Sequence, residues 1–177
     1  MDNQRLVERI QRATKDMFSM MLGMEASELA PYEEQGMTES FDGIVSLVGI
    51  GGPWTGMGTV YCGAELALQV TEKMLMTEQT EVNEEVLDAM AELANIIVGN
   101  VKTSLEADLG PLVLSIPTVI FGRNYKALNV MGRSRLVAPF VVDGLSFSVK
   151  FCLVPREARQ SGRTSGMFHQ LTSGNLA

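Results

Sequence analysis

The sequence predicts a mixed α/β fold of the α+β type, in which long helices pack on a mostly antiparallel sheet. Apolar residues recur at helical spacing over residues 3–24 and over a long run that starts after Asn83. Two pairs of alternating segments are each separated by turn residues, GGPWTG in one case and Asp143-Gly144 in the other. Because the order of helix, strand and hairpin occurs twice, we expect two pseudo-repeated helix-plus-antiparallel-strand units.

The first unit begins with an amphipathic helix over residues 3–24. Its predicted buried stripe consists of Leu6, Ile10, Ala13, Met17, Met21 and Met24. Residues 25–36 form an acidic connection, and residues 37–50 and 57–63 are strands joined by the glycine-rich turn. Trp54 in that turn is either a partner contact or an aromatic side chain folded back on the sheet. The glycines do not precede a helix, which argues against a phosphate-binding loop.

The second unit follows a predicted helix at residues 64–76. Asn83 is a suitable N-cap for the long helix, and Gly110-Pro111 ends it. Residues 112–121 are a strand interrupted by Pro117, which favours a sheet edge or a bulge. Alternating residues on either side of Asp143-Gly144 predict the last hairpin.

Composition limits the classes of function. The chain has 177 residues and 46% apolar content, enough for one domain, which we place at residues 1–154 with a C-terminal tail of unknown role at 155–177. A net charge of −7 argues against a nucleic-acid partner, and the apolar runs are too short to span a membrane, so we expect a cytoplasmic protein. Cys62 and Cys152 are predicted to be reduced thiols, and with His169 as the only histidine no metal site is expected.

The long helix carries two kinds of residue on separate arcs. The predicted core arc contains Val86, Leu87, Met90, Leu93, Ala94, Ile97, Val101 and Leu105. A narrow stripe opposite contains Asp88, Glu92, Asn95, Gly99, Lys102 and Glu106. Glycine inside a helix costs about 1 kcal/mol relative to alanine, so Gly99 suggests that another backbone approaches this stripe closely.

These residues carry a resemblance to a known family. Asp88, Glu92 and Asn95 have the spacing D-x3-E-x2-N, and Pro117 follows Asn95 by 22 positions. This pattern resembles the signature of the CheC/CheX/FliY family of chemotaxis response-regulator phosphatases, and EEVLDAMAELANIIVGNVKTSL is similar to the family's active helix. The resemblance covers about residues 3–154.

The resemblance implies an enzyme that hydrolyses the aspartyl phosphate of a CheY-like response regulator. Asn95 would orient the attacking water and Glu92 would pair with the regulator's lysine, which makes these two the expected catalytic pair. Asp88, Gly99 and Lys102 are expected to contact the partner, and Pro117 to shape the adjacent strand. The protein would need no cofactor of its own, because the regulator supplies Mg²⁺.

The first helix departs from the CheC pattern because VERIQRATKDMFSMM contains no second Glu-x-x-Asn pair. One site per chain resembles the CheX arrangement, whose members form homodimers. The alternative is a non-catalytic binding or scaffold domain of the same fold, like that of flagellar switch proteins, which only docks a regulator. An exposed stripe with Asn95 free and Gly99 uncovered would favour the enzyme, and burial of Glu92 against its own chain would favour the scaffold.

Overall fold

The computed structural model describes residues 2–35, 38–128 and 134–156. In chain order these residues form α1 (Asn3–Met17), the π-helical turn η1 (Phe18–Leu22), β1 (Ser27–Glu28), β2 (Tyr32–Glu34), β3 (Thr38–Gly51), β4 (Trp54–Cys62), α2 (Ala64–Leu75), α3 (Glu84–Leu109), β5 (Val113–Leu114), β6 (Thr118–Leu128), β7 (Arg135–Val142) and β8 (Leu145–Pro155). Within the described ranges, no helix combines the length and apolar character needed to cross a membrane.

All strands belong to one antiparallel sheet with β4 and β8 paired at its centre. On one side β3 follows β4, and the outer edge of β3 pairs with β5 and β6. On the other side β7 follows β8, and the outer edge of β7 pairs with β1 and β2. Each hairpin is therefore flanked by edge strands that come from the other half of the chain. The predicted α+β fold with helices packed on an antiparallel sheet is confirmed, and each half of the chain contributes edge strands to the hairpin of the other half.

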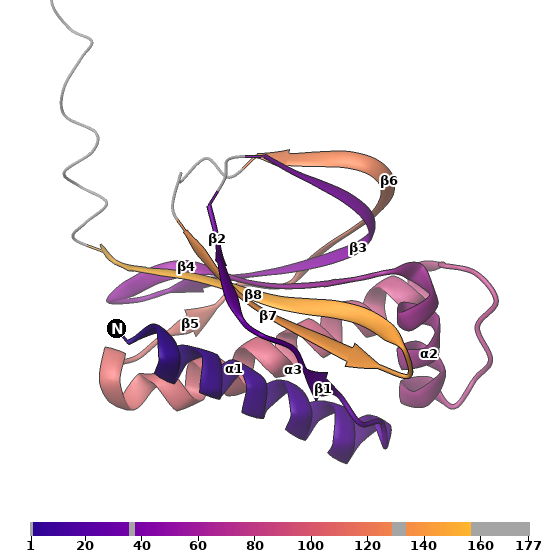
Figure 1. Cartoon of the computed structure of the whole chain (residues 1–177), viewed down its shortest axis with the longest axis horizontal. Coiled ribbons are helices and arrows are strands. Elements are labelled where there is room, and N and C mark those ends of the chain that lie inside the picture. Colours follow the sequence, from indigo (N-terminus) through magenta and orange to yellow (C-terminus); the bar gives the residue numbers. More distant parts are fainter. Residues whose placement is uncertain (1, 36–37, 129–133, 157–177) are drawn as a thin grey trace, which may run out of the picture.

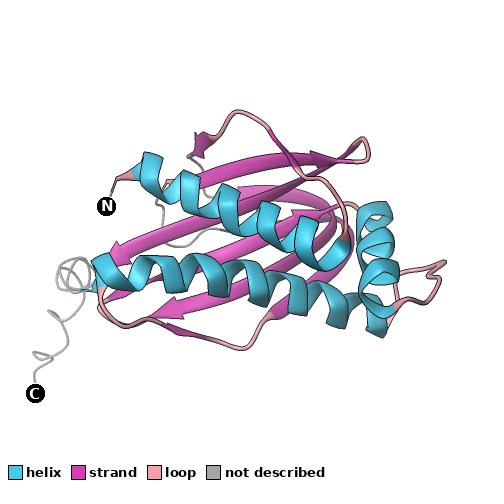
Figure 2. Cartoon of the chain, turned by 90° about the horizontal axis from the view of Figure 1, so that it is seen from below, coloured by secondary structure: helices cyan, strands magenta, loops and turns pink. Residues whose placement is uncertain are grey.

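The helices cover one face of the sheet, as Figure 1 shows with the helices below the strands. Seen from that side in Figure 2, α1 and α3 run next to each other along the sheet and the shorter α2 lies at one end. The core lies between these two layers because alternate residues of the strands point toward the helices. Examples are Ile44 and Val48 of β3, Val60 of β4 and Phe151 of β8, all of which are buried.

Two local features determine how closely the layers approach. A Cβ atom at Gly58 of β4 would lie 2.6 Å from a methyl carbon of Val98, so the glycine allows α3 to lie directly on the strand. At the other end of the core, the ring of Phe147 stacks on Phe18 at 4.7 Å and on Phe140 at 5.1 Å between centroids.

Both predicted hairpins are present. Asp143 and Gly144 have positive φ angles of 49° and 81°, which the tight turn between β7 and β8 requires. Pro117 lies between β5 and β6 at the outer edge of β3, as its lack of a backbone donor predicted. Cys62 is a buried thiol whose pKa is raised to about 12 by its removal from solvent, and Cys152 is likewise not in a disulfide.

The connection predicted over residues 25–36 is wrong in part, because β1 and β2 lie within it. Tyr32 is in register with Val137, and the carboxylate of Glu34 pairs with Arg135 and Lys150, each at 3.1 Å. Strands of two and three residues are too short to show periodicity, and they form because the edge of β7 offers unpaired backbone groups.

The predicted stripe of the first helix needs one correction. Met21 is 55% exposed, whereas Phe18 and Leu22 are buried. The π-helical turn changes the angular step along the helix, so extrapolating an α-helical period beyond Met17 assigns the wrong face. His169 and nearly all of the predicted tail lie outside the described residues.

Candidate functional site

The start of α3 is fixed by its N-cap. The side-chain oxygen of Asn83 accepts a hydrogen bond from the backbone N–H of Val86 at 3.0 Å. Glu84 and Glu85 occupy the first turn, where their charge is favourable near the positive end of the helix dipole. The helix then runs without a break to Leu109, so the predicted site residues are held on one rigid element.

Seven of the eight predicted core positions of α3 are buried, and Leu87 is partly buried. The polar stripe is continuous, but it does not lie opposite the core. Asp88 and Glu92 are exposed, whereas Asn95, Gly99 and Lys102 are half-buried. At Gly99 and Lys102 the reason is that Leu114 of β5 lies against Gly99 and Leu112 is bonded to Glu106, the partner of Lys102. A prediction from periodicity cannot include a neighbour that comes from a later part of the chain.

Glu92 and Asn95 are not engaged by the described parts of the chain. Neither side chain forms a hydrogen bond or an ion pair there, and the same is true of Asp88. Glu92 and Asn95 are separated by three positions, which places them on the same face of the helix. A free carboxylate and a free amide are thus presented together at the border between the helix surface and the sheet edge.

Gly99 lies one turn beyond Asn95 and faces Leu114 of β5. A Cβ atom at Gly99 would be 3.8 Å from the nearest atom, Cδ1 of Leu114, which is an ordinary van der Waals distance. Packing within the chain therefore has room for alanine at this position. The helix-propensity cost of about 1 kcal/mol has no explanation inside the described protein.

Lys102 differs from the other stripe residues because its ammonium group is engaged. It lies 2.8 Å from the carboxylate of Glu106, which also accepts a hydrogen bond from the backbone N–H of Leu112 at 2.9 Å. The hydrogen bond from Lys102, and then that from Leu112, hold the pKa of Glu106 below its usual range. This small network ties the end of α3 to the segment that enters β5.

The segment between β5 and β6 is fixed by Ser115. Its backbone N–H donates to the carbonyl of Gly49 at 2.9 Å, and its hydroxyl accepts from the N–H of Gly49 at 2.9 Å. The same hydroxyl donates to the carbonyl of Ile116 at 2.8 Å. Pro117 follows immediately, so the backbone around it is restrained on both sides. The sequence prediction included Pro117 but not Ser115, because a lone serine in an apolar segment carries no distinguishing signal.

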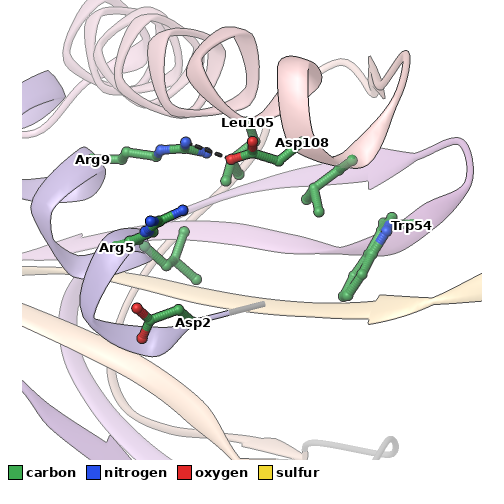
Figure 3. Close-up of a pocket in the computed structure, with 8 residues that line it drawn as sticks. Asp2, Arg5, Arg9, Trp54, Leu105 and Asp108 are labelled. Carbon is green, nitrogen blue, oxygen red and sulfur yellow. Dashed lines mark hydrogen bonds and ion pairs between the residues drawn. The ribbon is translucent and has the colours of Figure 1, made fainter.

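Trp54 belongs to a different part of the molecule. It lines a cavity of about 400 Å³ between the start of α1 and the end of α3, together with Asp2, Arg5, Leu6, Arg9, Leu105, Asp108 and Leu109 (Figure 3). Arg9 and Asp108 form an ion pair of 2.6 Å across it. Trp54 also packs against the core, which favours the interpretation that it folds back on the sheet. None of Asp88, Glu92, Asn95 and Gly99 lines this cavity.

The described residues contain no group of three or more histidine, cysteine, aspartate or glutamate side chains that could hold a metal ion. The free groups of the stripe are one carboxylate pair, Asp88 and Glu92, and one amide, Asn95. Such an arrangement can bind a cation through Glu92 and orient a polar molecule through Asn95.

Residues 44–141, more than half of the chain, match the family described as chemotaxis phosphatase CheX. The chain belongs to this CheX family. The matched region includes all of α3 and Pro117, and so it includes every residue of the candidate site. Among curated proteins no sequence matches the chain.

Solved structures of the same fold agree with this assignment. CheX from Desulfovibrio desulfuricans has 24% identity and a TM-score of 0.76, with 85% of this chain and 99% of that chain covered. A putative chemotaxis protein from Desulfovibrio vulgaris Hildenborough has 24% identity and a TM-score of 0.75, with 85% and 97% covered. The CheX-CheY-BeF3-Mg²⁺ complex from Borrelia burgdorferi has 25% identity and a TM-score of 0.68, with 84% and 97% covered.

Proposed function

We propose that this protein is an aspartyl-phosphate phosphatase that acts on a CheY-like response regulator. The observation that carries the proposal is that Glu92 and Asn95, on helix α3 of a CheX-family chain, have no side-chain partner among the described residues. The Borrelia CheX-CheY-BeF3-Mg²⁺ complex supports a regulator of the CheY type as the partner.

Asn95 is the catalytic residue in this proposal. Its amide both donates and accepts hydrogen bonds, so it can hold a water molecule in line with the phosphorus–oxygen bond without changing its own protonation. Water attacks phosphorus, the bond to the aspartate oxygen breaks, and inorganic phosphate leaves. Positioning of this kind contributes about 10² in rate, which corresponds to about 2.7 kcal/mol.

Glu92 determines how the regulator docks. Its free carboxylate would pair with the lysine of the regulator's phosphorylation site, one turn of helix away from Asn95. Asp88 extends the acidic surface on the same face, and Gly99 lowers the surface on the other side of Asn95. Lys102 would contact the partner while its ammonium group remains paired with the carboxylate of Glu106. Pro117 would act by shaping the neighbouring segment.

Magnesium enters this proposal with the partner. Mg²⁺ bound at the regulator's own phosphorylation site would neutralise the developing charge on the phosphoryl oxygens, and this chain would contribute no ligand to it. A homodimer and a cytoplasmic location complete the proposal, following the expectation from the family.

The test is turnover. A phosphorylated CheY-like regulator from the same genome is mixed with substoichiometric protein, and loss of the phosphoryl group is followed. We expect each molecule to act many times, Asn95→Ala to be about 10²-fold slower, and Asn100→Ala, which alters an exposed asparagine elsewhere on α3, to match the parent. Binding without any acceleration would instead identify a docking domain.

Glu92→Gln tests the proposed docking role separately. We expect it to weaken regulator binding, because a neutral amide cannot form the ion pair with the lysine. Glu65→Gln, at an exposed carboxylate on α2, is the matched control and should bind as the parent does. Parent-like affinity of Glu92→Gln would contradict the docking role.

A further inference from the structure

Ile116 is an exposed apolar side chain on a restrained backbone. It is 87% exposed, more than its neighbour Val113 at 66%. The three hydrogen bonds of Ser115 fix the backbone on one side of it, and Pro117 restrains the other. Its side chain gains almost no burial from the described residues, so it is available for contact with a partner.

Ile116 follows β5 by two residues, and β5 lies against the Gly99 end of the candidate site. Leu112 is bonded to Glu106, Leu114 lies against Gly99, and β6, which begins at Thr118, also contacts α3. The edge segment therefore runs back along α3 toward its N-terminal half. Ile116 is two residues beyond Leu114, a separation of at most about 7 Å. Four helical residues advance about 6 Å from Gly99 to Asn95.

We propose that Ile116 is a docking contact for the response regulator. It would bury its side chain against an apolar surface next to the regulator's phosphorylated aspartate while Glu92 and Asn95 engage that site. The proposal rests on the proposed function and adds a specificity determinant to it. The regulator is the expected partner because the segment that carries Ile116 runs along the same helix that presents Glu92 and Asn95.

The physical advantage is preorganisation. An apolar side chain on a fixed backbone loses little conformational entropy when it is buried in a complex. Contacts around the edge of a polar site also exclude water from the ion pair at its centre. Ile116 does not touch the reacting atoms in this arrangement, so it should affect affinity and KM and leave kcat unchanged.

The experiment compares Ile116→Ser and Ile116→Val with the parent. The probe is a CheY-like regulator loaded with beryllofluoride and Mg²⁺, and titration calorimetry gives Kd. We expect Ile116→Ser to raise Kd and KM about tenfold with kcat unchanged, and Ile116→Val to retain most of the affinity. Met20→Ser, at an 82% exposed methionine on η1, is the matched control and should leave Kd unchanged.

Molar mass measured by light scattering completes the design. Weaker regulator binding by Ile116→Ser at unchanged mass supports the proposal. An unchanged Kd overturns the proposal. A higher Kd accompanied by a change in molar mass also overturns it, because the side chain would then serve an interface between copies of this chain. If Asn95→Ala turned over as fast as the parent, the catalytic proposal would fail, while the effect of Ile116→Ser on Kd would still be decisive.

Discussion

Replacing Gly99 with alanine separates the two reasons for a glycine inside a helix. The substitution adds a methyl group 3.8 Å from Cδ1 of Leu114, where no atom has to move. Alanine is favoured over glycine in a helix interior by about 1 kcal/mol. For a chain of this size, that gain should raise Tm by about 2–4 °C. We therefore expect Gly99→Ala to be more stable than the parent.

The same variant should be impaired toward its partner. If the regulator's backbone approaches α3 at Gly99, the added methyl group overpacks that contact, at a cost of about 1–3 kcal/mol. A cost of 1.4 kcal/mol weakens affinity about tenfold. Stability is measured by urea denaturation and Kd by titration with the beryllofluoride-loaded regulator.

Two results would refute this reasoning. A lower free energy of unfolding would mean that the chain itself requires the glycine, and a stabilised variant with unchanged Kd would mean that no partner approaches there. Gly58→Ala provides the contrast, because its Cβ atom would lie 2.6 Å from Val98 and should destabilise the fold by about 1–3 kcal/mol.

Three further variants test the account of the fold. The buried hydroxyl of Ser46 finds no hydrogen-bond partner among the described residues, so Ser46→Ala should raise the free energy of unfolding by about 1 kcal/mol. A lower free energy of unfolding in urea denaturation would contradict this. Asn83→Ala should lower it by about 1 kcal/mol through loss of the N-cap of α3, and parent-like stability would show that the cap is dispensable. Because the pKa of Glu106 is lowered in the folded protein, its stabilising contribution is present above the unfolded pKa and is lost as pH falls through the folded one. Glu106→Gln should therefore destabilise the protein at neutral pH and match the parent once the pH has fallen below the folded-state pKa of Glu106, and a deficit that persisted in acid would contradict the assignment.

The elements with strong local signals were predictable from the sequence. The Asn83 cap and the Gly110 end delimit α3, and Asp143-Gly144 specifies its hairpin, because each depends on neighbouring residues alone. The edge strands β1 and β2 were missed because they depend on an open edge of β7 more than a hundred residues away. The exposure of Met21 was not predicted, because the π-helical turn that changes its face carries no evident signature in the sequence.

Part of the candidate site also follows from local sequence, and part depends on tertiary packing. Helical spacing places Asp88, Glu92 and Asn95 on one face, and this follows from the period of the α-helix. The half-burial of Gly99 beside Leu114 and the exposure of Ile116 could not be predicted, since both depend on tertiary packing at the edge of the sheet. Ile116 gave the signal of an ordinary strand residue, and only its exposure distinguishes it.

In the proposed mechanism, Asn95 acts on the rate of phosphoryl hydrolysis and not on binding. The decisive measurement is single-turnover dephosphorylation of a CheY-like regulator by the Asn95→Ala variant at saturating concentration. Kd for the beryllofluoride-loaded regulator is measured on the same preparation. We expect a rate about 10²-fold lower with Kd unchanged. A parent-like rate, or a rate loss that disappears when the weaker binding is corrected for, would contradict it.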